Sequence, residues 1–274
     1  MAPPMLIIWA DGIGSARVAP DDGRSILLTV VTRLAEKLRE QGRQVVPTRV
    51  TWPASMAGVG GPKSWDAAAR EGVEDIDRIL RANPGREVVL LGYSGGCKVI
   101  HDWLGAQPAR GLERVRAVGL LSDPFRPATR YQHDTPDPGG YGIAGARLGP
   151  IAGRTFWTSY GADVISSCPP DSPLRTVADL SDKIPGSFVD DLGDHLRLNN
   201  WQLANYMRLW RKDPLAYINS FLPRMGAARD GVVGYLLGGA HTEAYTRAYS
   251  TPGRPFDRRS LAHRLADTIS WALR

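Results

Sequence analysis

The chain has 274 residues, of which 43% are hydrophobic and 23% are charged, and its formal net charge is +6. This composition is ordinary for a globular protein with a sizeable core, and it excludes a low-complexity chain. The longest apolar runs are too short for a membrane-spanning helix. Lys and Arg are scattered and no recognition motif accompanies them, so we expect no nucleic-acid partner.

The N-terminal segment "MAPPMLIIWADG" lacks a basic region and a long apolar region, so we expect no secretory signal. The two cysteines, Cys97 and Cys168, belong to no Cys-x-x-Cys or Cys/His array, which argues against a zinc site. We expect two free thiols, and one disulfide is the alternative for a protein that works outside a cell.

Strands and helices alternate along the first part of the chain. The pattern predicts strands over residues 5–10, 44–50, 87–91, 115–121 and 154–159, and helices over 25–41, 64–82 and 96–106. Ser64 is the expected N-cap of the second helix, and Gly42 follows the first one as a C′ glycine. Such alternation predicts a mainly parallel sheet of about five strands with helices on both faces.

The pattern changes after the fifth strand. Residues 174–226 contain several short helical patterns and no convincing strand, which indicates a helical lid or linker inserted in a single domain of residues 1–274. Residues 230–250 return to the core, and 260–273 predict a final amphipathic helix.

The segment "LLGYSGGCK" places Ser94 in a G-x-S-x-G motif between a predicted strand and a predicted helix. A serine in such a sharp turn presents its hydroxyl at the carboxyl edge of the sheet, and small neighbours let the turn close. The following N–H, that of Gly95, points at the same space and can stabilise an oxyanion. The alternative is a tight glycine turn in a Rossmann-like sheet.

A nucleophilic serine needs a base and an orienting acid. The histidines are His101, His133, His195, His241 and His263. In α/β-hydrolases the triad follows the chain order Ser, acid, His, and this order favours His241, which lies in the late glycine-rich segment "LLGGAHTEAY".

Three aspartates are candidates for the acid. Asp163 follows the fifth strand and is expected at the carboxyl edge of the sheet, where catalytic loops gather. Asp123 follows the fourth strand but starts an Asp-Pro turn, and Asp171 lies in the turn-like "CPPDSP". We favour Asp163. The second oxyanion N–H is expected from the loop "WADGIGS", from Asp11, Gly12 or Ile13.

Several segments together resemble lysin B, the mycolylarabinogalactan esterase of bacteriophages that infect mycobacteria and their relatives, within the cutinase-like α/β-hydrolases. They are "IIWADGIG", "VTWPASMAGVGGPKSWDAAAREGVEDIDRIL", "LLGYSGGCKVIHDWL", "LLSDPFRP", "GADVISSCPPDSPLRTVADL" and "GAHTEAYTRAY". Only two predicted strands precede the nucleophile strand, as in the short, cutinase-like version of the fold. Two positions depart from the family: Gly95 stands where Gln is usual, and Asp11 where Gly-Thr is usual.

The resemblance implies a serine esterase that hydrolyses the ester between mycolic acid and arabinogalactan during phage-induced lysis. It assigns Ser94, Asp163 and His241 as the triad and implies no metal and no organic cofactor. Residues Trp201, Tyr206 and Trp210 would line an apolar groove for the lipid, or else pack the lid onto the core. Such an enzyme is made in the host cytoplasm and acts on the envelope after release.

Besides a basic nucleic-acid binder, which the scattered charge and the lack of a recognition motif disfavour, two other functions stay open on the sequence. One is a cutinase-like esterase or lipase that acts on another lipid and has no role in phage lysis. The other is a non-catalytic binding protein on the same fold, which the order of Ser94, Asp163 and His241 argues against.

Overall fold

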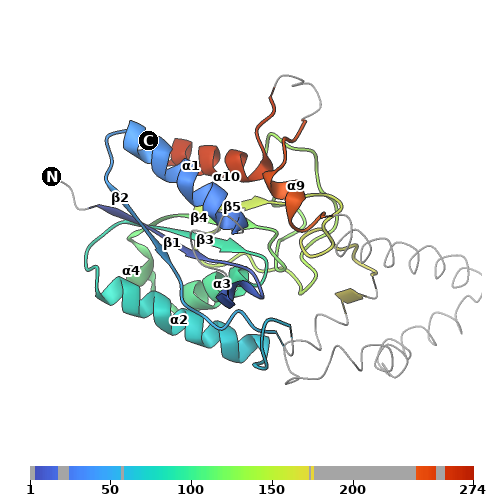
Figure 1. Ribbon diagram of the computed structural model, residues 1–274, viewed down its shortest axis with the longest axis horizontal. Helices are drawn as coiled ribbons and strands as arrows, with labels where there is room; N and C mark the ends of the chain where they lie inside the picture. The colour runs from blue at the N-terminus through green and yellow to red at the C-terminus, as the bar shows by residue number, and fades with distance from the viewer. Residues whose placement is uncertain (1–3, 18–24, 57–58, 173, 176–238, 251–256) are drawn as a thin grey trace, which may run out of the picture.

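The computed structural model describes residues 4–17, 25–56, 59–172, 174–175, 239–250 and 257–274 (Figure 1). Almost all of the predicted helical insertion, including Trp201, Tyr206 and Trp210, lies outside the described residues.

Five parallel strands form one sheet, which confirms the predicted mainly parallel sheet of about five strands. The strands are β1 (Met5–Ala10), β2 (Val45–Arg49), β3 (Val88–Tyr93), β4 (Val115–Leu121) and β5 (Thr155–Thr158). Their order in the sheet is β2-β1-β3-β4-β5 and every pairing is parallel. Strand β3, which precedes Ser94, is therefore central, with β4 beside it, so the residues that follow these two strands lie at the same edge of the sheet.

Helices cover both faces of the sheet (Figure 1). The longer ones are α1 (Ile26–Glu40), α2 (Trp65–Arg81), α3 (Gly96–Ala106) and α10 (Leu261–Ala272), and the shorter ones are α4 (Ala109–Leu112), α9 (Glu243–Thr246), η1 (Ser15–Arg17) and η2 (Ala152–Arg154). Helices α1 and α10 pack together on one face, and α2 and α3 pack together on the other. None of the helices in the described ranges is both long and apolar enough to cross a lipid bilayer.

Serine caps explain where three of these helices begin. The hydroxyls of Ser25, Ser64 and Ser260 accept hydrogen bonds from backbone N–H groups in the first turns of α1, α2 and α10. Gly42 follows α1 with a φ of 77°, which is the left-handed conformation expected of a C′ glycine. Of these ends, the Ser64 cap and the Gly42 stop were predicted from the sequence, and both are confirmed.

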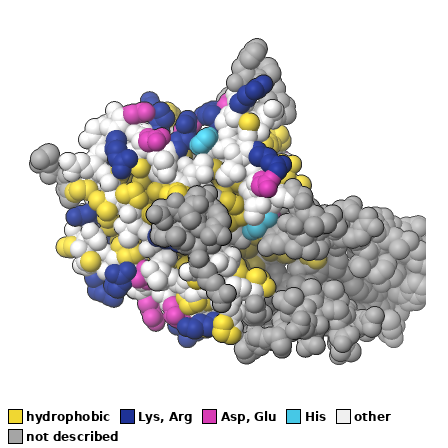
Figure 2. Space-filling view, in the orientation of Figure 1, with side chains coloured by type: hydrophobic (Ala, Val, Ile, Leu, Met, Phe, Trp, Pro, Cys, Tyr) yellow, Lys and Arg dark blue, Asp and Glu magenta, His cyan; other side chains and the backbone are white. Residues whose placement is uncertain are grey.

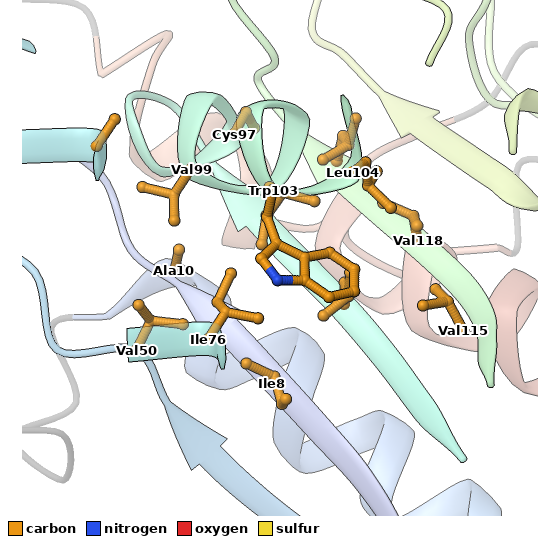
Figure 3. Packing of buried hydrophobic residues seen from close by; sticks show 14 of the residues in the cluster. Ile8, Ala10, Val50, Ile76, Cys97, Val99, Trp103, Leu104, Val115 and Val118 are labelled. Atoms are coloured by element: carbon orange, nitrogen blue, oxygen red, sulfur yellow. The ribbon is translucent and has the colours of Figure 1, made fainter. Parts of the chain in front are cut away.

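The core has two layers, because alternate residues of each strand face opposite helices. In β1, Leu6 and Ile8 pack toward α2 and α3, whereas Ile7 and Trp9 pack toward α1 and α10. Figure 3 shows the first layer, where Trp103 extends from α3 toward the sheet. The indole N–H of Trp103 donates to Asp77 of α2 at 2.8 Å, so this large ring is buried with its polar atom satisfied.

On the face shown in Figure 2, Lys and Arg side chains are dispersed and several lie beside Asp or Glu. Charge pairs also tie the C-terminal helix to the rest of the molecule. Arg33 of α1 binds Asp267 of α10 at 2.6 Å, and the buried Arg264 binds Asp134 at 2.6 Å. The positive net charge thus does not gather into one patch on this face.

Two glycines of α3 lead to opposite predictions for stability. A Cβ on Gly96 would lie 2.2 Å from the carbonyl oxygen of Ala10, so Gly96→Ala should lower the free energy of unfolding by about 1–3 kcal/mol. A Cβ on Gly105 meets nothing within 4 Å, so Gly105→Ala should raise it by about 0.5–1 kcal/mol. Urea denaturation measures both; a Gly96→Ala variant as stable as wild type would contradict the close approach of α3 to β1.

Candidate active site

Ser94 occupies a strained turn between β3 and α3, as the motif predicted. Its φ is 51°, which is the left-handed region that non-glycine residues rarely adopt. Two glycines make room for the turn. A Cβ on Gly92 would lie 2.9 Å from the Cα of Cys97, and one on Gly96 would meet the carbonyl oxygens of Ala10 and Asp11. The glycines of G-x-S-x-G are thus required by close backbone contacts.

The structure brings Ser94, His241 and Asp163 together from distant parts of the chain. Nε2 of His241 lies 2.7 Å from Oγ of Ser94. On the other side of the ring, Nδ1 lies 3.2 Å and 3.3 Å from the two carboxylate oxygens of Asp163. All three side chains are buried. This is the geometry of a nucleophile, a base and an orienting acid.

The carboxylate of Asp163 is fully buried but well supplied with hydrogen-bond donors. Its Oδ2 accepts from the hydroxyls of Ser122 at 2.5 Å and Tyr245 at 2.6 Å, and its Oδ1 accepts from the N–H of Ile165 at 3.0 Å. Burial alone would raise the pKa of Asp163, but the charge of His241 and these hydrogen bonds outweigh it, and the net pKa lies below the ordinary value. The acid is therefore ionised at neutral pH.

Two tyrosines contact the side chains of Asp163 and His241: Tyr245 binds the carboxylate, and Tyr93 packs on the imidazole. Burial and the neighbouring Asp163 charge raise the pKa of Tyr245 well above its ordinary value, so its hydroxyl stays a donor. The Tyr93 ring stacks on the imidazole of His241 with centroids 5.3 Å apart, and its hydroxyl donates to the His241 carbonyl at 2.5 Å. The plane of the histidine ring is fixed by these contacts.

The loop after β1 lies against Ser94 and Gly95. A Cβ on Gly12 would be 3.2 Å from Cβ of Ser94, and one on Gly95 would be 2.5 Å from Cγ1 of Ile13. Ile13 thus fills the space next to position 95, where the family that the sequence resembles usually has a glutamine. The carboxylate of Asp11, by contrast, is engaged with Ser25 at 2.7 Å and Arg49 at 2.9 Å.

The other candidate acids and bases belong elsewhere. Asp123 is buried and accepts from Nε2 of His101 and the indole of Trp157, both at 2.9 Å. This second buried His–Asp pair joins α3 to the loop after β4. Asp171 and His133 are exposed, and His263 lies half-buried on α10. His195 lies outside the described residues.

Three residues of the site were not predicted: Tyr93, Ser122 and Tyr245. Each had a usable position in the sequence. Tyr93 is the first of the two variable residues of the motif, Ser122 directly follows β4, and Tyr245 comes four residues after His241. Their partners, however, come from distant segments, so the sequence pattern alone did not indicate what they contact. Among the residues that the structure describes, no group of three or more His, Cys, Asp or Glu side chains is placed to hold a metal.

Tyr245→Phe should lower the free energy of unfolding at pH 7 by about 2 kcal/mol, because a buried carboxylate loses one donor. The pKa of Asp163 is lowered by folding, so its stabilising effect is complete above the unfolded value and is lost as pH falls through the folded one. The gap between wild type and Tyr245→Phe should therefore shrink as the pH of urea denaturation falls below about 4. A gap that does not change with pH would mean that the tyrosine acts through packing instead.

Comparison with known proteins agrees with this geometry. A model of the cutinase family matches residues 14–187, a range that includes Ser94 and Asp163 and ends before His241. Carboxylesterase Culp1 of Mycobacterium tuberculosis is 25% identical over 174 residues, which cover 62% of this chain and 67% of that protein.

Solved structures similar to the chain include an acetyl xylan esterase and a lysin B. The catalytic core domain of acetyl xylan esterase from Trichoderma reesei is 16% identical, with a TM-score of 0.47, over 80% of this chain and 99% of that one. Lysin B from Mycobacteriophage D29 is 19% identical, with a TM-score of 0.45, over 61% of this chain and 68% of that one. Since the family model spans more than half of the sequence, the chain belongs to the cutinase family and is a carboxylic ester hydrolase.

Proposed function

We propose that this esterase hydrolyses the ester bond between mycolic acid and arabinogalactan in a mycobacterial-type envelope, and that it serves phage-induced lysis. The observation that carries the catalytic part is the 2.7 Å contact between Ser94 and His241, backed by the buried Asp163. The resemblance of six segments to lysin B supports the substrate. Under this proposal the enzyme reaches the envelope after release from the cytoplasm.

The proposed reaction has two stages. His241 Nε2 takes the hydroxyl proton of Ser94 as Oγ of Ser94 attacks the ester carbonyl carbon. His241 then gives this proton to the leaving oxygen when the C–O bond breaks, so the alcohol departs. In the second stage, His241 deprotonates a water molecule that attacks the acyl carbon. The bond from this carbon to Ser94 Oγ breaks, His241 returns the proton to Oγ, and the carboxylic acid is released. Asp163 holds the imidazole in the Nδ1–H tautomer and stabilises its charged form.

The oxyanion formed at each stage needs backbone donors. The N–H of Gly95 lies at the start of α3, where the first N–H groups have no partner within the helix. We assign the second donor to the loop of Asp11, Gly12 and Ile13, whose last two residues lie against Ser94 and Gly95. Each donor is worth about 3 kcal/mol in the transition state.

Ser94→Ala should lower kcat/KM for a para-nitrophenyl ester by about a thousandfold or more, because the acyl-enzyme cannot form. Esters of short and long acyl chains are assayed with wild type and the variant, and thermal melting confirms that both are folded. A Ser94→Ala variant as active as wild type would overturn the assignment of the nucleophile.

The substrate is tested on purified mycolyl-arabinogalactan. Wild type should release free mycolic acid, detected by mass spectrometry, and Ser94→Ala should release none. Activity on simple lipid esters without any release of mycolic acid would instead indicate a cutinase-like esterase for another lipid.

A further inference from the structure

We infer that Ser122 is a positioning residue that extends the hydrogen-bonded set of Ser94, His241 and Asp163. Its hydroxyl bridges His241 and Asp163. The inference rests on the proposed function and deepens it. Ser122 Oγ lies 3.0 Å from Nδ1 of His241 and 2.5 Å from Oδ2 of Asp163. The contact from Nδ1 to this hydroxyl is thus shorter than either contact from Nδ1 to the carboxylate.

The direction of these hydrogen bonds follows from the available protons. An ionised carboxylate only accepts, so the single proton of the Ser122 hydroxyl goes to Asp163. The remaining lone pairs of Oγ face Nδ1 of His241, which must then be the protonated nitrogen. Nε2 is left with its lone pair toward Ser94, which is what a general base needs.

The hydroxyl also suits the charged state of the histidine. When His241 takes the proton of Ser94, positive charge develops on a ring whose Nδ1–H points at Ser122 Oγ. The O–H dipole has its negative end toward the ring and its positive end toward Asp163, so it is aligned with the field of the ion pair. Such an oriented dipole stabilises the transition state without reorganisation.

The backbone at Ser122 indicates that this placement is maintained against local strain. Ser122 directly follows β4 and has a φ of 52°, nearly the same as Ser94 after the neighbouring strand β3. Its N–H continues the sheet by donating to Thr158 at 3.0 Å, and its side chain is fully buried. A glycine would adopt this conformation at lower cost, so the hydroxyl is what a serine adds here.

Two variants separate the hydroxyl from the backbone. Ser122→Gly removes the hydroxyl and relieves the left-handed strain, whereas Ser122→Ala removes the hydroxyl and keeps the strain. The melting temperature should be higher for the Gly variant than for the Ala variant. Even so, both should lose about tenfold in kcat with KM unchanged to within about twofold. The matched control is Ser159→Ala, which removes a buried serine hydroxyl that makes no hydrogen bond within the described part of the chain, and it should keep wild-type kcat.

A second readout does not depend on turnover. In proton NMR at low pH, the Nδ1 proton of His241 should resonate at a different position in Ser122→Gly and at the wild-type position in Ser159→Ala. Equal kcat in wild type and both Ser122 variants, or a loss confined to the less stable Ala variant, would overturn the inference. If wild type hydrolyses no ester, the proposed function fails, and the NMR comparison still decides whether Ser122 holds the histidine.

Discussion

The site depends on one buried charge, the ionised carboxylate of Asp163. A carboxylate with no exposed surface is costly to bury unless donors surround it. Here the donors come from separate parts of the chain: Ser122 after β4, Tyr245 in α9, Ile165 in the same loop and His241. Satisfying this charge therefore fixes where the loops meet, and so fixes the histidine that contacts Ser94.

Backbone strain gathers at the same edge of the sheet. Three non-glycine residues have positive φ among those that the structure describes, namely Ala54, Ser94 and Ser122. The carbonyl of Ala54 accepts from the N–H of Gly14 at 2.7 Å, so this strained residue holds the loop proposed to carry the second oxyanion donor. Each of these positive-φ conformations costs about 1–3 kcal/mol and persists because the surrounding contacts hold it in place, which is typical of a functional site.

Much of the fold and part of the site were predictable from the sequence, because local chemistry determines them. Apolar runs indicated the strands, and apolar residues at helical spacing indicated the helices. The Ser64 cap and the Gly42 stop marked two helix ends, and the motif around Ser94 indicated the turn. Tyr93, Ser122 and Tyr245 were missed because their roles come from tertiary contacts between segments far apart in sequence. Asp123 looked like an acid because it too follows a strand, yet it pairs with His101 in the packing of α3.

The central claim is that Ser94, activated by His241 and Asp163, forms a covalent acyl-enzyme. The most direct measurement is mass spectrometry of the protein after reaction with a fluorophosphonate, which mimics the ester and traps the nucleophile. The account predicts a single adduct on Ser94, formed much more slowly in Asp163→Asn, which leaves the histidine without its ionised partner. An adduct on another residue, or labelling at the wild-type rate without the Asp163 carboxylate, would contradict it.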